Sequence, residues 1–342
     1  MAPLITVQGL TKDYRLTRRR EGVMGGLIDL VRPRKRTLRA VDDVSFTIDP
    51  GEMVGYIGAN GAGKSTTIKM LTGILTPTGG EVRVGGLVPY RQRQSYTRHI
   101  GVVFGQRTQL WWDLAVVESF RLLQRIYEVP EARYREQMDF FNGLLGLDEF
   151  LSQPVRKLSL GQRMRCDLAA ALLHEPRVLF LDEPTIGLDV VAKENVRRFL
   201  REARDQLGVT VILTTHDLTD IEQLCRRIII IDKGKVLYNG LLDDLRRGPG
   251  HKLRLCLDLV DPVTPAELTA SLGGLPVEWA DADQPADAPS HRHCALFSRS
   301  ETNAATILAA VLAAHRLRDM ALTEPAIEDV VRRIYREGLV RS

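Results

Sequence analysis

The sequence lacks any run of about 18 consecutive apolar residues, the length that a helix needs to cross a membrane. Its densest apolar runs, at 228–231 and 304–314, are too short or too amphipathic. The first ten residues also lack the basic start and the apolar stretch of a secretion signal. We therefore expect a cytoplasmic chain that reaches the inner face of the cell membrane through a partner.

Cysteine and net charge are both scarce. Four cysteines occur, Cys166, Cys225, Cys256 and Cys294, and no two of them form a CxxC pair. This pattern predicts reduced, mostly buried thiols. The net charge of +4 is too small to indicate nucleic acid as the main partner, so we expect no nucleic acid. With 342 residues, of which 44% are hydrophobic, the chain has enough material for two domains.

Apolar runs that alternate with helical patterns predict an α/β core. The run at 178–181 is short and uniformly apolar, as in a strand that is buried on both faces. Helix and strand patterns alternate from 192 to 231, and this order predicts a parallel sheet wrapped by helices. Helical periodicity also covers 116–147. The chain breaks near Gly248-Pro249-Gly250, and we predict a small accessory α+β domain over 249–342, with a strand of alternating leucines at 253–259.

One glycine-rich stretch has the spacing of a phosphate-binding loop. GANGAGKS, at 58–65, fits GxxxxGK[ST] directly after a strand pattern and directly before a helical one. Glycines let successive backbone N–H groups turn towards phosphate oxygens, and the start of the helix adds its positive end. Lys64 is expected to reach the β- and γ-phosphates, and the Ser65 hydroxyl to ligate Mg²⁺. The predicted phosphate-binding residues are Gly58, Asn60, Gly61, Ala62, Gly63, Lys64, Ser65 and Thr66.

Two adjacent acids follow the apolar run at 178–181. A buried parallel strand presents the residues at its carboxyl end to the ligand crevice. Asp182 is therefore placed to hold Mg²⁺, directly or through water, and Glu183 to orient and deprotonate the attacking water.

Further motifs distinguish one family among the many phosphate-loop enzymes. Leu158-Ser159-Leu160-Gly161-Gln162 resembles the signature sequence of ABC-type ATPases, normally LSGGQ, and lies shortly before the Asp182 strand, as in that family. The resemblance extends to a Q-loop at Gln106, a D-loop ending at Asp189, a switch histidine at His216 and an adenine-stacking aromatic residue at Tyr14. It covers about 4–245 and is closest to single-cassette ATPases of exporters with separate permeases.

The resemblance implies the architecture of the chain. A nucleotide-binding domain over 1–248 would combine a parallel-sheet core, an antiparallel β subdomain and a helical subdomain at about 107–173. An insert at 15–39 would interrupt it, and the α+β domain over 249–342 would follow.

The resemblance also implies that two copies share each nucleotide. ATP and Mg²⁺ would bind the phosphate loop of one subunit, with Ser65, Gln106 and Asp182 at the metal and Glu183, His216 and Gln106 in catalysis. A second copy, or a homologous subunit, would complete the site. In the family the signature faces the partner's nucleotide, where Ser159 and the Gly161 N–H would donate to the γ-phosphate. The resemblance also implies that Gln162 of the signature and Asp189 of the D-loop belong to the nucleotide-binding residues.

Two departures from the family pattern stand out. Leu160 replaces the middle glycine of the signature, which should affect affinity rather than the role of the helix start. Gly105 is an extra residue before Gln106, and it makes Gln109 a rival for the Mg²⁺ and water contact.

Two segments suggest contact with a membrane complex. Trp111 and Trp112 lie in a predicted loop, where they would either form a docking groove for a permease helix or pack within the helical subdomain. The insert at 15–39 carries nine cations around an apolar middle at 23–31. It would form a basic amphipathic hairpin against anionic lipid or the permease rim, or else a solvated loop.

We therefore expect an ATP-hydrolysing subunit of a membrane transporter, most simply an exporter. The alternatives are an importer subunit, or a soluble ABC-type ATPase acting on ribosomes or DNA. The last usually has two cassettes or a long coiled-coil insertion, and this sequence has neither.

Overall fold

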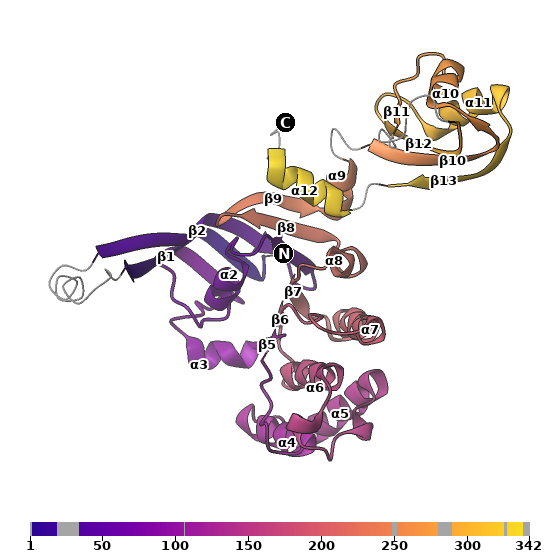
Figure 1. Cartoon of the computed structure of the whole chain (residues 1–342). Helices are drawn as coiled ribbons and strands as arrows, with labels where there is room; N and C mark the ends of the chain where they lie inside the picture. The colour runs from indigo at the N-terminus through magenta and orange to yellow at the C-terminus, as the bar shows by residue number, and fades with distance from the viewer. Residues whose placement is uncertain are drawn as a thin grey trace, which may run out of the picture. The chain divides into compact units, whose positions relative to one another are not determined.

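The computed structural model describes residues 2–18, 34–105, 107–247, 252–279, 289–324 and 327–337. The chain divides into two compact units, Met1–Leu242 and Asp243–Ser342, and each is described by itself (Figure 1).

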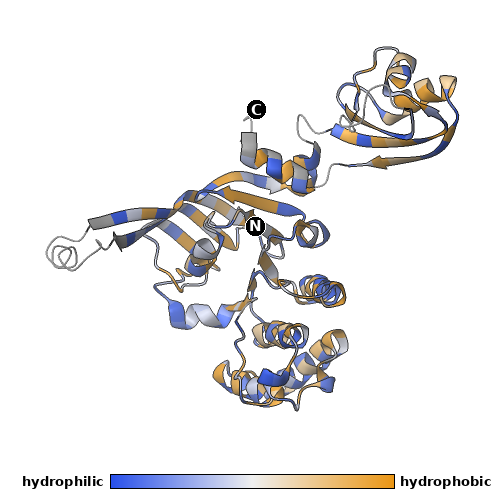
Figure 2. Ribbon diagram, viewed as in Figure 1, coloured by the Kyte–Doolittle hydropathy of each residue, from blue (hydrophilic) through white to orange (hydrophobic). Residues whose placement is uncertain are grey.

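The first unit is built on a six-stranded sheet with the order β5-β6-β7-β3-β8-β9. Its strands are parallel except β9, which runs antiparallel to β8. Residues 178–181, 210–214 and 228–231 are all buried, as expected for strands covered on both faces, and Figure 2 shows the hydrophobic colouring of β8. The strands are β3 (Met53–Gly58), β5 (Ile100–Phe104), β6 (Val178–Asp182), β7 (Thr210–Thr214), β8 (Arg227–Asp232) and β9 (Lys235–Leu241).

A three-stranded antiparallel sheet packs against this core. Its order is β2-β1-β4, from β1 (Ile5–Arg18), β2 (Arg34–Ile48) and β4 (Gly79–Val84). Buried residues of β1 and β2 share one hydrophobic cluster with Tyr56 of β3, Phe180 of β6 and Ile68 of helix α2 (Lys64–Leu71). The helix that follows the phosphate loop is thereby fixed in the core.

The ends of β1 and β2 form the arms of the predicted basic hairpin. Arg15 pairs with Thr37 and Arg18 with Arg34, in a continuous antiparallel register. Residues 19–33, which include the apolar middle and several of the cations, lie outside the described residues.

Helices make up the rest of the first unit. The helical periodicity over 116–147 divides into two helices, which are interrupted at Tyr127–Pro130. Helix α4 contacts α6, and α5 contacts α7. The longer helices are α4 (Val116–Ile126), α5 (Glu131–Leu145), α6 (Leu160–Leu172), α7 (Val190–Leu207) and α8 (Leu218–Leu224). The short ones are α3 (Arg93–Tyr96), η1 (Thr97–His99), η2 (Leu147–Glu149) and η3 (Val155–Lys157).

The second unit is an α+β structure around an antiparallel sheet with the order β11-β12-β10-β13. The alternating leucines at 253–259 do form a strand, and they pack with α10 and α11 in one cluster. β12 and β13 were not predicted. The elements are α9 (Leu242–Arg247), β10 (Lys252–Val263), α10 (Pro265–Ser271), β11 (Glu278–Trp279), β12 (Ser290–Ser298), α11 (Ala304–Ala314), β13 (Leu317–Thr323) and α12 (Ile327–Glu337). Among the described residues of both units, no helix is long and apolar enough to span a bilayer.

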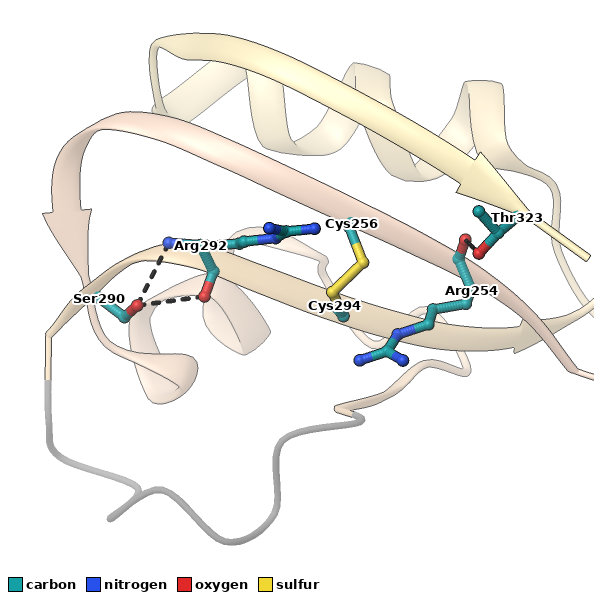
Figure 3. The surroundings of a disulfide bond; sticks show 6 residues. All are labelled: Arg254, Cys256, Ser290, Arg292, Cys294 and Thr323. Carbon is teal, nitrogen blue, oxygen red and sulfur yellow. Dashed lines mark hydrogen bonds between the residues drawn. A yellow bond between two sulfur atoms is a disulfide. The ribbon is translucent and has the colours of Figure 1, made fainter. Parts of the chain in front are cut away.

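The prediction of four reduced cysteines is wrong for two of them. Cys256 of β10 lies opposite Cys294 of β12, and the two form a disulfide (Figure 3). Directly opposed residues of neighbouring antiparallel strands bring their side chains together, and spacing along the sequence does not reveal this. Cys166 and Cys225 are free and buried, as predicted. Burial raises the pKa of the Cys166 thiol to about 12, so it is not a reactive thiolate.

A buried ion pair fixes the helices beside the carboxyl ends of the strands. Asp220 of α8 is fully buried and accepts from Arg197 of α7 at 2.6 Å. We expect Asp220→Ala to lower the free energy of unfolding by about 3–5 kcal/mol, because it leaves the Arg197 guanidinium buried without its buried carboxylate partner. The matched change Glu194→Ala removes an exposed partner of the same arginine and should cost less than about 1 kcal/mol. Urea titration measures both, and equal losses would contradict this assignment.

Candidate functional site

The phosphate loop lies between β3, which ends at Gly58, and α2, which begins at Lys64. Gly63 immediately before the helix has φ +109°, and a Cβ there would lie 2.6 Å from the Ala40 carbonyl oxygen. This position therefore requires glycine. The first N–H groups of a helix have no partner within the helix, so those of α2 are available to an anion. The predicted residues Asn60, Gly61, Ala62, Ser65 and Thr66 lie in this loop or in the first turn of α2.

The Lys64 side chain folds back onto the phosphate loop that precedes it. Its ammonium donates to the carbonyl oxygens of Gly58 at 2.6 Å and Ala59 at 3.1 Å. Burial lowers the pKa of Lys64, and the nearby charges of Glu183 and Asp182 partly oppose this shift. A desolvated ammonium among outward-turned amides suits a polyanion such as a triphosphate.

Asp182 ends β6 as predicted, and its carboxylate faces two hydroxyl groups. Thr214, at the end of the neighbouring β7, donates to Asp182 Oδ1 at 2.6 Å. Ser65 Oγ lies 3.5 Å from the same oxygen. A carboxylate and a hydroxyl placed together are the oxygen ligands that Mg²⁺ prefers, so the residues present fit this ion. Thr214 was not predicted. Thr214 could have been predicted as a site residue from its position at a strand end, two residues before His216.

Glu183 follows in an unusual backbone conformation. Its φ is +56°, in the left-handed region, and its N–H donates to the Thr214 carbonyl at 2.9 Å. His216 Nδ1 lies 3.5 Å from Glu183 Oε1. The predicted catalytic carboxylate and switch histidine are thus neighbours at the carboxyl ends of adjacent parallel strands.

A cleft of about 600 Å³ opens at this edge of the sheet, a size typical of small-molecule sites. It brings together four predicted residues, Tyr14, Ser65, Asp182 and Glu183. Lining residues that were not predicted include Lys69, Ile74, Leu75, Phe104, Gly105 and Arg107. The lining includes the Tyr14 ring and the cations Lys69 and Arg107. An aromatic ring can stack on a nucleotide base, and cations attract its anionic phosphates.

Of the two Q-loop candidates, Gln106 lies outside the described residues. Its rival, Gln109, lies in the loop after β5 and contacts α6, where the Gln109 side-chain amide donates to the Asp167 backbone carbonyl at 2.9 Å. The Asp167 carboxylate in turn accepts from Thr108 Oγ1 at 2.8 Å and from the Gln109 N–H at 3.1 Å. Burial raises the pKa of Asp167 to about 6, and these hydrogen bonds limit the shift. Residues 108–109 are thereby attached to the helix that carries the signature.

The signature residues form a second site, separate from the cleft at Asp182. Ser159 caps α6 by accepting from the Gln162 N–H at 3.2 Å, and Gln162 Oε1 accepts from the Ser159 N–H at 2.9 Å. Because Ser159 Oγ accepts in this cap, its own O–H stays able to donate. Asp189 likewise caps α7, accepting from the Ala192 N–H at 2.8 Å. A groove of about 330 Å³ joins these two helix starts, and its lining includes Ser159, Leu160, Gly161, Gln162, Gly187 and Asp189. Among the described residues, none of those lining this groove also lines the cleft at Asp182.

Known proteins are similar to this chain in sequence. The family profile described as ABC transporter matches residues 41–186. The ABC transporter ATP-binding protein NatA of Bacillus subtilis is 32% identical over 62% of this chain and 86% of its own length. The methionine import ATP-binding protein MetN 2 of Enterococcus faecalis is 32% identical over 61% of this chain and 62% of its own length.

Solved structures agree on the fold. The ATP-binding cassette MJ0796, solved as a dimer in a post-hydrolysis state with ADP and Pi, superposes with a TM-score of 0.58. It is 26% identical, and the match covers 70% of this chain and 98% of that one. With the glycine loop, the strand-end acids and the capped signature helix in place, the chain belongs to the family of ABC transporter ATP-binding proteins.

Proposed function

We propose that this chain hydrolyses ATP as one half of a nucleotide-sandwich dimer and so powers a membrane exporter. One observation carries the proposal: the phosphate cleft and the signature groove have no lining residue in common among the described residues. Each copy therefore holds two half-sites rather than one complete site. A second copy in the opposite orientation brings each half-site to its complement.

Within the first half-site the roles follow from position. Lys64 and the amides at the start of α2 bind the phosphates, and Tyr14 stacks on the base. Ser65, Asp182 and the predicted Gln106 would hold Mg²⁺, which when bound would supply positive charge to the phosphates. Glu183 orients the attacking water and accepts its proton, and His216 beside it contacts the γ-phosphate.

The second half-site supplies donors from the partner. The Ser159 hydroxyl and the Gly161 N–H, at the positive end of α6, donate to the γ-phosphate, and Gln162 and Asp189 hold the two helix starts. ATP then bridges the two copies, and loss of the γ-phosphate removes the bridge. Binding closes the dimer and hydrolysis opens it, which gives a permease two states.

The exposed tryptophans mark the side that meets a permease. Trp111 is 38% exposed and Trp112 is 50% exposed, which is unusual for such large apolar rings. An apolar groove of about 570 Å³ lies close by along α4, lined in part by Leu114, Val117 and Leu122. A cytoplasmic permease helix fits a groove of this kind. The same loop is attached to α6 through Asp167, so movement at the groove reaches the signature.

The proposal that the transporter is an exporter is based on the single cassette, the tryptophan loop and the second unit. Import is the second candidate, because MetN 2, a similar protein, has a name that states methionine import. A substrate assay in vesicles that contain the assembled transporter separates the two directions.

The hairpin at 15–39 is proposed to touch anionic lipid. Arg15 and Arg36 are exposed on its described arms. Arg39, at the base of the hairpin, is instead paired within the protein. It forms ion pairs with Asp13 and Asp42, and these raise the pKa of Arg39.

The first prediction tests hydrolysis. Glu183→Gln removes the base but keeps the shape of the side chain, so turnover should fall about 10²–10⁴-fold while ATP binding is retained. With Mg·ATP the variant should elute as a dimer from a sizing column. Glu149→Gln, an exposed change in η2, is the control and should behave as wild type. A fully active Glu183→Gln protein would refute the assignment.

The second prediction tests binding. Lys64→Ala removes a charged donor to the phosphates, so affinity for ADP should fall about 10–100-fold. Lys157→Ala, an exposed change in η3, should leave this affinity intact. Fluorescence titration with a labelled ADP measures both, and an unchanged affinity in Lys64→Ala would remove Lys64 from the site.

The third prediction tests the lipid contact. Each cation near an anionic surface contributes about 1 kcal/mol, so replacing Arg18, Arg19 and Arg20 by Ser should weaken binding to phosphatidylserine vesicles about 100-fold. The control replaces Arg299, Arg316 and Arg318, three arginines of the second unit, by Ser. Co-sedimentation that is equal for the two variants and the wild type would show that the hairpin does not bind lipid.

A further inference from the structure

The extra residue of the Q-loop, Gly105, lies directly against the backbone of the two strand-end acids. Its N–H donates to the Asp182 carbonyl at 2.8 Å. A Cβ at this position would lie 2.0 Å from the Glu183 carbonyl oxygen and 2.9 Å from the Glu183 carbonyl carbon. This is the shortest such approach among the described glycines, and the atoms met are backbone, which cannot rotate away. Any side chain at 105 must therefore displace either the Glu183 peptide or the loop itself.

The backbone conformation of Glu183 depends on its neighbours, so it is easily disturbed by such a displacement. A left-handed φ is strained for glutamate and persists only where the surroundings impose it. Two neighbours impose it here. On one side the Thr214 carbonyl of β7 accepts the Glu183 N–H at 2.9 Å, and on the other side Gly105 packs against the Glu183 carbonyl. The direction of the Glu183 carboxylate follows from this conformation.

We infer that Gly105 is a positioning residue for Glu183: by lacking a Cβ, it lets the end of β5 pack on the Asp182–Glu183 backbone and hold the catalytic carboxylate in place. The inference rests on the proposed ATP hydrolysis. It separates catalysis from binding, because nucleotide affinity depends on Lys64 and the amides of α2, and the close neighbours of Gly105 belong to 182–183 instead. A misplacement of about 1 Å can reduce a rate about 100-fold.

The test compares Gly105→Ala with Gly143→Ala. Gly143 is exposed in the last turn of α5, and a Cβ there meets no atom within 4 Å, so this change adds the same methyl group without a clash. ATPase turnover is measured at saturating Mg·ATP, and ADP affinity by fluorescence titration. We expect Gly105→Ala to lower kcat about tenfold or more. The Kd for ADP should stay within about twofold of the wild type, which also shows that the variant is folded. Gly143→Ala should change neither quantity.

Three outcomes would contradict either the role of Gly105 or the proposed ATP hydrolysis, and each can be told apart from the others. A Gly105→Ala protein with wild-type kcat shows that Gly105 does not position Glu183. A fall in affinity as large as the fall in kcat shows that Gly105 maintains the cleft as a whole. If the wild type and Gly143→Ala both fail to hydrolyse ATP, the proposed function itself fails.

Discussion

The proposed chemistry depends on how two neighbouring strands hold the backbone of Asp182 and Glu183. The Asp182 carbonyl accepts the Gly105 N–H from the end of β5, and the Glu183 N–H donates to the Thr214 carbonyl at the end of β7. The carboxyl ends of parallel strands meet at one edge, so this backbone brings two carboxylates to the edge of the sheet at the phosphate loop, and we propose that one binds the metal and the other accepts a proton. The strained φ of Glu183 is maintained by rigid neighbours, as a preorganised site requires.

The same fold keeps the signature away from the carboxylates. Ser159 and Asp189 cap their helices in a groove of their own, and the Asp167 contacts attach the signature helix to the loop that leads to the tryptophans. In the proposed function, a permease that moves the tryptophan loop also moves the signature donors proposed to reach the partner's nucleotide. One dimer contact would then couple hydrolysis to transport.

Local patterns in the sequence were enough to predict the phosphate loop and the β6 strand with its acids, because each depends on neighbours in the chain: glycine spacing in one case and an uninterrupted apolar run in the other. Local patterns also predicted the parallel sheet. The signature at the start of a helix and the antiparallel and helical subdomains were implied by the resemblance to ABC-type ATPases. What the sequence could not predict comes from residues that are distant along the chain. Cys256 and Cys294 are 38 residues apart, and only the register of β10 and β12 brings them together.

The contacts of Thr214, Asp167 and Gly105 likewise arise between separate elements. The sequence showed Gly105 as an extra residue. It did not show why glycine is needed there, because the Glu183 carbonyl that contacts Gly105 lies 78 positions away in the chain. The long β12 and β13 strands escaped prediction for a related physical reason. β13 is an edge strand whose side chains are mostly exposed, and β12 has three consecutive buried residues, so neither strand shows the strict apolar alternation of β10.

The central claim, that each triphosphate is shared between two copies, can be tested by mixing two inactive variants. Lys64→Ala spoils the phosphate half-site, and Ser159→Phe spoils the signature half-site. If the site is shared, a mixed dimer regains one intact site, and the mixture should hydrolyse ATP although neither variant does so alone. A mixture as inactive as its components would contradict the account.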